Sequence, residues 1–234
     1  MVMLNVICLK HGTKYGPEYV NKLYNMIQRH LTVPHRFVCF TENPQYLDPK
    51  IEIVPLPKDE ALHGWWWKLY VFKEGHFYQG DTNLFIDLDM VIVGNMDKFI
   101  NYLPDRFVGL ENVNRIFKRY PSTLGSAVMK WPAETYTDIW TEFKKNPTSA
   151  RKWPGDQDWI WRLHKSTIKF FPRDWIISYK WEARTIKELI KENGRSKFKS
   201  VRSPEIPKDT AILAFHGTPD PHEVADQIIV DNWR

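Results

Sequence analysis

The chain has 234 residues, of which 43% are hydrophobic and 26% charged, values typical of an ordinary soluble globular protein. This length fits one domain with a sizeable core, which we place at residues 1–234. The net charge of +5 favours an anionic partner. The basic residues are scattered apart from a run at 191–202, and we expect no nucleic-acid partner.

The two cysteines and the opening residues bear on the compartment. Cys8 and Cys39 each lie in an apolar run, "VICL" and "FVCF", and we predict two buried thiols on neighbouring strands. That use of cysteine is typical of a reducing compartment. The opening "MVMLNVICLKHG" lacks a basic start, and its apolar run is too short for a signal peptide or a membrane span. We therefore expect a cytoplasmic protein.

The first elements predict a parallel sheet. "MLNVICL" at 3–9 is a β-rich apolar run, and the loop "KHGTKYGP" follows it. Residues 18–31 carry apolar side chains at helical spacing, with Pro17 suited to the first turn. Strands are expected at 35–41 and 51–56. This strand–helix–strand order indicates an α/β fold with a right-handed crossover.

The remaining elements continue the alternation. We predict helices at 65–75, 134–146 and 155–164, the first ending at Gly75. Strands are expected at 83–89, 125–131 and 211–217. Residues 184–209 combine Gly, Ser, Pro and many charges, and we expect a mobile loop region there.

Two aspartates interrupt the most apolar segment, "NLFIDLDMVIVGN" at 83–95. Residues two apart on a strand point to the same side, so Asp87 and Asp89 converge if the chain stays extended. Two adjacent carboxylates repel each other unless they share a proton or a cation. A divalent ion neutralises both and keeps positions free for phosphate oxygens. The alternative is structural: Asp89 caps a turn and Asp87 accepts hydrogen bonds from backbone amides.

The chain resembles a known family over nearly its whole length, from about Asn5 to about Val224. "LFIDLDMVIV" resembles the D-x-D segment of GT-A-fold glycosyltransferases, and it is most similar to the small glycosyltransferase-8-like proteins. Further stretches on both sides of this segment lie in the order used by that family: "VICLKHGTKYGPEYVNKLYNMIQRH", "GWWWKLYVF", "LGSAVMKW", "GDQDWIW" and "AFHGTPDPHEV". The resemblance implies a single Rossmann-like α/β domain with a mixed, mostly parallel central sheet flanked by helices.

The resemblance also implies a metal and a donor. Asp87, Asp89 and His216 would hold Mn²⁺ or Mg²⁺, and one imidazole among carboxylates favours Mn²⁺. The donor would be a nucleotide-diphosphate sugar, a UDP- or GDP-sugar. The alternative for His216 is an ordinary histidine in a turn, although Gly217 beside it permits close backbone approach to a phosphate.

Other residues would contact the nucleotide. Leu9 and Lys10 would reach the base through backbone groups, and Tyr15 would stack on it. Lys68 is a candidate for a charge-assisted contact to a phosphate or to Asp87; its alternative is a solvated helix lysine.

The segment "GDQD" opens a predicted helix, and its acidic residues are also good helix-capping residues. In the family this segment faces the donor sugar and the acceptor, a hydroxyl of a glycan or other molecule. Asp156, Gln157 and Asp158 are therefore the catalytic candidates. In an inverting enzyme Asp158 would be the general base; in a retaining enzyme it would position the sugar.

Three features depart from the family or extend it. Asp220-Pro221 stands where the family has Lys-Pro, which removes a phosphate lysine; Lys68 or a basic residue of 191–202 would have to replace it. Gly125 and Ala127 stand where the family has Asn and Gly, which leaves the donor sugar open. The consecutive Trp65, Trp66 and Trp67 would contribute to an acceptor platform, although consecutive helix positions cannot share a face.

Three functions compete. The first is a metal-dependent glycosyltransferase. The second is a catalytically idle GT-A domain that binds a nucleotide sugar or glycan. The third is a haloacid-dehalogenase-like phosphatase, whose D-x-D motif lies nearer the start of the chain than this one. The sequence leaves the base, the sugar, the acceptor, the stereochemical outcome and the oligomeric state open.

Overall fold

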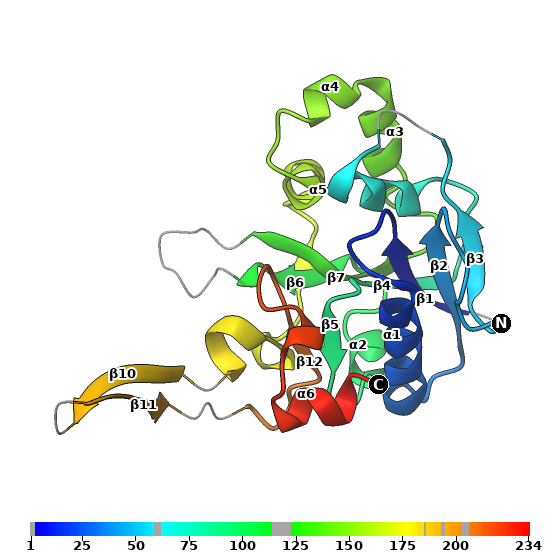
Figure 1. Ribbon diagram of the computed structural model, residues 1–234. Coiled ribbons are helices and arrows are strands. Elements are labelled where there is room, and N and C mark those ends of the chain that lie inside the picture. Colours follow the sequence, from blue (N-terminus) through cyan, green and yellow to red (C-terminus); the bar gives the residue numbers. More distant parts are fainter. Residues whose placement is uncertain (1–2, 59–61, 114–122, 185, 193–194, 203–205) are drawn as a thin grey trace.

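A seven-stranded sheet forms the centre of the computed structural model, which describes residues 3–58, 62–113, 123–184, 186–192, 195–202 and 206–234 (Figure 1). The strand order is β3-β2-β1-β4-β7-β6-β8. Strands β1 to β4 are mutually parallel, β7 runs antiparallel to its neighbours β4 and β6, and β8 is parallel to β6. The mixed, mostly parallel sheet expected from the sequence is thereby confirmed. The strands are β1 Leu4–Lys10, β2 His35–Thr41, β3 Glu52–Pro55, β4 Thr82–Ile86, β6 Val108–Glu111, β7 Leu124–Pro132 and β8 Lys169–Phe170.

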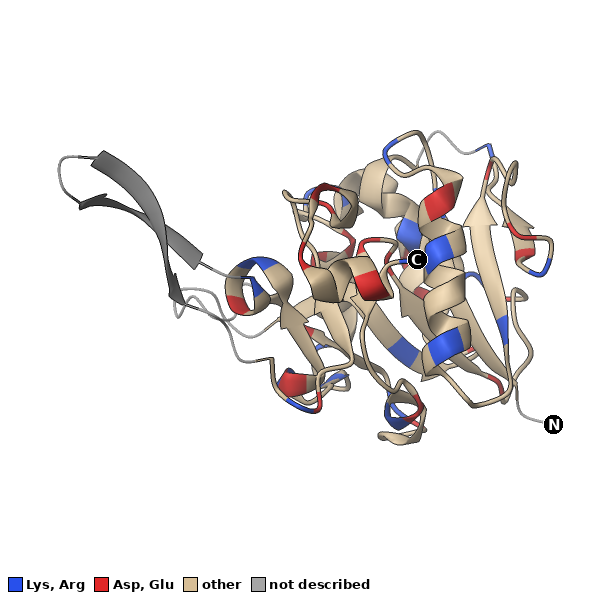
Figure 2. Ribbon diagram, turned by 60° about the horizontal axis from the view of Figure 1, so that its bottom comes forward, with Lys and Arg blue, Asp and Glu red and all other residues tan. Residues whose placement is uncertain are grey.

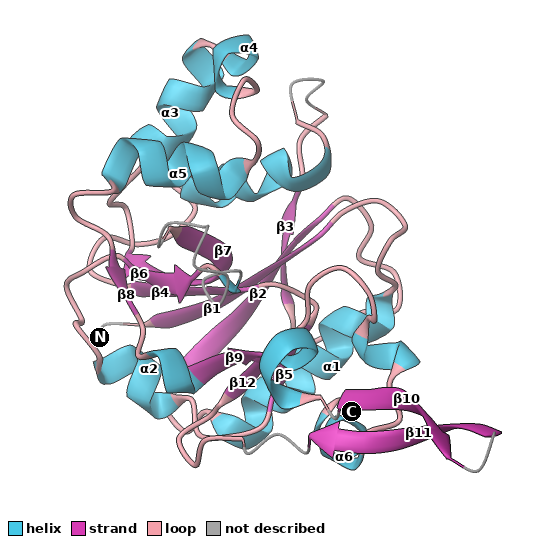
Figure 3. Ribbon diagram, turned by 90° about the vertical axis from the view of Figure 1, so that its left-hand side faces the viewer, coloured by secondary structure: helices cyan, strands magenta, loops and turns pink. Residues whose placement is uncertain are grey.

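Helices cover both faces of this sheet and enclose two apolar cores (Figure 3). One face carries α1 (Pro17–His30), α2 (Asp97–Asn101) and α6 (Gln227–Asn232). The other carries α3 (Asp138–Lys145), α4 (Pro147–Ala150) and α5 (Asp156–His164), with the 3₁₀ helix η1 (Gly64–Phe72) packed against α3 and α5. Shorter helical turns are η3 Arg173–Trp175, η4 Tyr179–Ala183 and η5 Pro221–Glu223.

The first half of the chain folds as its sequence predicts. Helix α1 begins at Pro17 and buries one face, which includes Val20, Leu23 and Ile27. Cys8 and Cys39 are register partners on the parallel strands β1 and β2, and both thiols are free and buried. The expected pair of buried thiols on neighbouring strands is confirmed.

A second sheet of three strands, not expected from the sequence, packs beside the first. Its order is β5-β12-β9, with β5 at Met90–Ile92, β12 at Ile212–Ala214 and β9 at Ile176–Ser178. Ala214 pairs with Met90 on one side and with Ser178 on the other. The sheet therefore brings the segment that follows Asp89 next to the segment that precedes His216.

Several element boundaries differ from those expected. The predicted strand 83–89 ends at Ile86, so Asp87 and Asp89 lie in a turn and not on an extended strand. The helix expected at 65–75 is a 3₁₀ helix that ends at Phe72, before Gly75. The helix expected at 134–146 begins only at Asp138. The strand expected at 211–217 ends at Ala214, before His216.

In the region 184–209, expected to be mobile, the described residues form an antiparallel hairpin, β10 Ile186–Glu192 and β11 Arg195–Arg202. The hairpin extends away from the body of the molecule (Figure 1). The region is therefore not a structureless loop, and its expected mobility stays a prediction.

The helices and the surface charge add two further facts. No helix in the described part of the chain is both long and apolar enough to cross a bilayer. Figure 2 shows Lys and Arg recurring along α1, with Asp and Glu on neighbouring elements.

Candidate active site

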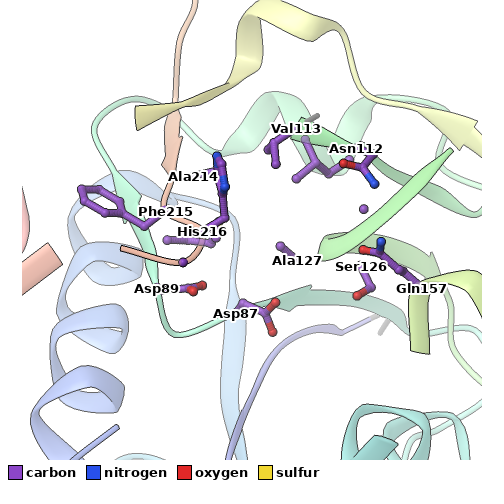
Figure 4. Close-up of a pocket in the computed structure, with 14 residues that line it drawn as sticks. Asp87, Asp89, Asn112, Val113, Ser126, Ala127, Gln157, Ala214, Phe215 and His216 are labelled. Carbon is purple, nitrogen blue, oxygen red and sulfur yellow. The ribbon is translucent and has the colours of Figure 1, made fainter. Parts of the chain in front are cut away.

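The two aspartates occupy the turn that joins β4 to β5. The amide of Asp87 donates to the carbonyl of Ala127 on β7 at 2.8 Å, and the amide of Met90 closes the turn on the carbonyl of Asp87 at 3.3 Å. The carbonyl of Asp89 accepts from the amide of Phe215 at 3.2 Å. These backbone bonds place both carboxylates at the carboxyl end of β4, where ligands bind in open α/β sheets. Their side chains lie next to each other (Figure 4).

Two cavities meet at this turn, and both are lined by Asp87 and Asp89. The first, the His216 cavity, has a volume of about 250 Å³ and is also lined by Ser126, Gln157, His216 and Gly217. The second, the Tyr15 cavity, has a volume of about 370 Å³, and its further lining residues are Leu9, His11, Lys14, Tyr15, Trp65 and Lys68. The turn thus separates two compartments that share its carboxylates.

Lys68 is the central cation of the site. Its Nζ lies 2.8 Å from Oδ2 of Asp87 and 3.6 Å from Oδ2 of Asp156. It also donates to the hydroxyl and the carbonyl of Ser126, and that hydroxyl donates to Asp156 at 2.6 Å. Burial alone would lower the pKa of Lys68, but the carboxylates of Asp87 and Asp156 outweigh it and raise the pKa. Lys68 is therefore a buried ion-pair partner of Asp87, as one of the two interpretations of the sequence predicted.

The carboxylates of the turn carry more negative charge than Lys68 neutralises. Burial raises the pKa of Asp87, although Lys68 acts in the opposite direction. Burial and the charge of Asp87 together raise the pKa of Asp89 to about 7. A cation bound here would stabilise the ionised form of both carboxylates and so lower both pKa values.

Tyr15 contacts this turn through its hydroxyl. The hydroxyl donates to Oδ2 of Asp89 at 3.1 Å and lies 3.4 Å from Oδ1 of Asp220. The ammonium of Lys14 donates to the same hydroxyl at 2.7 Å. Burial and the charges of Asp89 and Asp220 raise the pKa of Tyr15. The side chain that we expected to stack on a base also orients a carboxylate of the D-x-D turn.

His216 lines the same cavity as the aspartates and is hydrogen-bonded to Ser178 at the end of β9. Its Nε2 is 2.7 Å from the hydroxyl of Ser178, which accepts from the amide of Trp181 at 3.1 Å. Burial and the charge of Lys180 lower the pKa of His216 and so favour the neutral imidazole. Figure 4 shows the ring directed away from the two carboxylates in that view. Gly217 beside it has φ +68°, a conformation that suits glycine.

The residue types around the His216 cavity match a cation, although the three expected ligands are not assembled. Within the described ranges, no three His, Cys, Asp or Glu side chains are grouped closely enough to hold a metal ion. Asp87, Asp89 and His216 nevertheless line one cavity, and Asp89 has the raised pKa of an under-compensated carboxylate. Two carboxylates and one neutral imidazole are a suitable donor set for Mn²⁺.

The start of α5 places its three candidates in three environments. Asp156 is buried against Ser126 and Lys68, so it supports Lys68 and lines neither cavity. Gln157 lines the His216 cavity. Asp158 lines neither of the two cavities and lies beside Gly155; burial and the charge of Asp156 raise its pKa.

The remaining candidates are partly brought into the site. Leu9 lines the Tyr15 cavity, whereas Lys10 is buried at the end of β1 and lines neither cavity. Ala127 and Gly125, where the family has other residues, line the His216 cavity. Asp220, in the place of the family lysine, contributes a carboxylate next to Tyr15.

The three tryptophans of η1 point in different directions, as consecutive residues must. Trp66 is buried and stacks on Phe143 with ring centroids 5.6 Å apart. Trp67 lies 6.3 Å from the ring of His11. Trp65 is 59% exposed and lines the Tyr15 cavity. Only Trp65 among the three offers an open ring surface beside the site.

Sequence reasoning missed Ser126 and Ser178. Ser126 lies in the quoted "LGSAVMKW" and is a buried polar side chain that bridges Lys68 and Asp156. Ser178 is the last residue of "WIIS", an apolar run that ends in a hydroxyl, which is the pattern of a strand end at a site. That run lay in no predicted element, and for this reason Ser178 was not found.

The sequence matches no known family model and no curated protein. Solved structures are similar to it. An active-site mutant of LgtC, in which a glutamine is replaced by glutamate, has a TM-score of 0.61 and 10% identity, over 97% of this chain and 93% of that chain. The fold is the GT-A fold.

A second GT-A structure is similar over a smaller part of its length. The glycosyltransferase GlyE of Streptococcus pneumoniae TIGR4 has a TM-score of 0.56 and 11% identity, over 76% of this chain and 48% of that chain. The chain thus spans about half the length of GlyE. At identities this low, both likenesses establish the fold, and the chemistry depends on the residues of the site.

Proposed function

We propose that this chain is a metal-dependent glycosyltransferase that transfers a sugar from a UDP- or GDP-sugar to a hydroxyl of a glycan or another acceptor. The observation that carries the proposal is the D-x-D turn, whose two carboxylates are shared by two cavities at the carboxyl end of β4. A nucleoside diphosphate and its sugar need two adjoining compartments of this kind, with a cation between them. The GT-A fold supports the same reaction class.

In this proposal Asp87, Asp89 and His216 hold the cation. A bound Mn²⁺ or Mg²⁺ supplies the positive charge that stabilises the leaving nucleoside diphosphate. Lys68 fixes the orientation of Asp87, and the hydroxyl of Tyr15 fixes that of Asp89. Both contacts reduce the freedom of the carboxylates before the donor binds.

The two cavities divide the donor. The nucleotide occupies the Tyr15 cavity, with Leu9 and Lys10 contributing the backbone at the end of β1 and Tyr15 its ring. The donor sugar occupies the His216 cavity, where Gln157 and Gly217 contact it and its phosphate.

The acceptor hydroxyl approaches from the start of α5. Asp158 is the proposed general base, because its raised pKa moves it towards the range in which a carboxylate accepts a proton efficiently. Asp156 acts through Lys68 and Ser126 as a positioning residue.

A thermal-shift panel of UDP, GDP, UDP-sugars and GDP-sugars, each with and without Mn²⁺, tests this proposal. A ligand present at 100 times its Kd stabilises the folded state by about 2.7 kcal/mol, so the correct nucleotide with Mn²⁺ raises Tm by several degrees. If none of these nucleotides shifts Tm in the presence of Mn²⁺, the donor assignment is wrong.

A second function has a specific observation in its favour. His216 is bonded to Ser178 and directed away from the aspartates, and Asp220 places a further carboxylate near the proposed diphosphate site. Both features are those of an idle GT-A domain that binds a glycan or nucleotide sugar without turnover. Metal-dependent hydrolysis of UDP- or GDP-sugars by the pure protein separates the two functions. Phosphate release from simple monoesters would instead indicate the phosphatase, which the GT-A fold does not favour.

A further inference from the structure

Trp65 is an unusual surface residue, because a large apolar ring lies open next to a polar site. It is 59% exposed, whereas the neighbouring Trp66 is 4% exposed and anchors η1 in the core. The backbone at Trp65 is held between Gly64, with φ +53°, and the buried Trp66. An open indole on a fixed backbone loses little conformational entropy when a ligand covers it.

The edge of the Trp65 ring packs on the start of α5. A Cβ atom on Gly155 would lie 3.4 Å from Nε1 and 3.6 Å from Cδ1 of Trp65. The indole therefore lies next to the backbone of the G-D-Q-D segment at Gly155. Trp65 thus connects the Tyr15 cavity, which it lines, with the helix that carries Asp158.

The carboxylate of Asp158 lies at the same glycine. Its Oδ2 is 3.7 Å from the position that a Cβ on Gly155 would take, and Gly155 is also the residue next to the indole. An aromatic face packs against the C–H groups on one side of a sugar ring, and a neighbouring carboxylate accepts hydrogen bonds from its hydroxyls. One sugar ring can therefore contact both groups.

We infer that Trp65, Gly155 and Asp158 form the binding subsite for a sugar ring of the acceptor, which makes the acceptor a carbohydrate. The inference rests on the proposed glycosyltransferase function and names its acceptor class. The sugar stacks on the open face of Trp65 and presents a hydroxyl to Asp158. A nucleobase fits this subsite less well, because a nucleotide bound here would bring its phosphates towards the negative charge of Asp158. The base is instead assigned to the part of the Tyr15 cavity at the end of β1, which Leu9, His11 and Tyr15 line.

Saturation-transfer NMR on the full chain tests the subsite. The probes are the methyl glycosides of glucose, galactose, mannose and N-acetylglucosamine at millimolar concentration, with UDP and Mg²⁺ present. At least one glycoside receives saturation from the wild-type protein, chiefly at the C–H groups of one ring face. Trp65→Ala lowers this signal at least fivefold, and Trp65→Phe retains part of it.

Tyr78→Ala is the matched control, since Tyr78 is an exposed aromatic residue, 76% exposed, that precedes β4 and lies at the opposite end of that strand from Asp87. It leaves the signal unchanged. Equal signals from Trp65→Ala and wild type, or no signal from any glycoside with wild type, overturn the inference. A tenfold loss of UDP affinity in Trp65→Ala would assign the ring to the base and overturn it as well. If the glycosides bind through Trp65 while no nucleotide binds, the donor assignment fails and the sugar subsite stands.

Discussion

The ammonium of Lys68 lies 2.8 Å from Oδ2 of Asp87, so the 3₁₀ helix η1 and the D-x-D turn are joined by a partly buried ion pair, in which the side chain of Asp87 is 31% exposed. The side chain of Lys68 is 10% exposed and that of Asp156, its second partner, is 7% exposed. Removal of one member of such a group leaves the others buried and without compensation.

Lys68→Met is therefore expected to lower the free energy of unfolding by about 3 kcal/mol, because Asp87 and Asp156 lose their counter-ion. Urea denaturation at pH 7 measures the loss. Lys73→Met, which removes an exposed lysine at the end of the same helix, is the control and changes stability by less than about 0.5 kcal/mol. Equal effects of the two substitutions would show that the ion pair adds nothing to stability.

Asp89→Asn is expected to keep the fold and abolish Mn²⁺-dependent nucleotide binding, since the amide carries no charge for the cation. Isothermal titration calorimetry with UDP and Mn²⁺ measures the affinity of the variant for the nucleotide. A donor affinity equal to that of the wild type would contradict the cation site.

The same substitution has a pH-dependent effect on the metal-free protein. The pKa of Asp89 is raised to about 7 in the folded state, so its ionisation costs stability as the pH rises from about 4 to 7. Asp89→Asn removes that cost, and the variant is more stable than the wild type by at least about 1 kcal/mol at pH 8, with no gain at pH 3.5. Urea unfolding at the two pH values tests the sign. A wild type that is more stable at pH 8 would show that the carboxylate is compensated without a cation.

Gly155→Ala probes the contact between α5 and Trp65. The added Cβ would lie 3.4 Å from Nε1, and φ at Gly155 is −166°, an extended conformation open to any residue. The backbone therefore accepts alanine, and the added methyl group comes into van der Waals contact with the edge of the indole and with Asp158, where it occupies space at the proposed sugar subsite. We expect acceptor-glycoside binding to weaken several-fold with UDP affinity unchanged, as measured by NMR titration. A parallel loss of UDP affinity would place this contact in the nucleotide site.

Lys130 is fully buried, and we expect its role to be the stabilisation of the fold. Its ammonium donates to the carbonyls of Ile100, Tyr102 and Leu103, which follow or end α2. Lys130→Met leaves three carbonyls without this donor and should lower stability by about 3 kcal/mol, at about 1 kcal/mol for each lost bond. Thermal unfolding measures the loss. Nucleotide binding by the folded variant stays unchanged, and its loss would mean that the region of α2 contributes to the site.

Local patterns in the sequence were sufficient for the elements that depend on local chemistry. Helix α1 has Pro17 at its start and an apolar stripe of period 3.6, and α5 starts at the acidic residues of "GDQD". Strands β1 and β2 are almost continuous apolar runs, and their pairing through Cys8 and Cys39 followed from those runs.

Elements whose bounds depend on partners far along the chain could not be predicted from local patterns. The predicted strand 83–89 ends at Ile86 because the amide of Asp87 bonds to Ala127, a partner on β7 that no local pattern reveals. The three-stranded sheet escaped detection because β5 and β9 have only three residues each, too few for a period, although a strand containing β12 was expected at 211–217. The role of Lys68 remained open because its partners Asp87 and Asp156 come from separate segments of the chain.

The pairing of Met90 with Ala214 also sets an order for biosynthesis. When the ribosome has synthesised the chain as far as β7, both aspartates are present. The strand β12, which pairs with β5 directly after them, has not yet been made. Long-range pairings of this kind form late, after the local elements have collapsed. The nascent protein would consequently pass through a stage in which most of the main sheet has been made while the D-x-D turn still lacks its partner strand β12, and the proposed donor site would be completed only after β12 is synthesised.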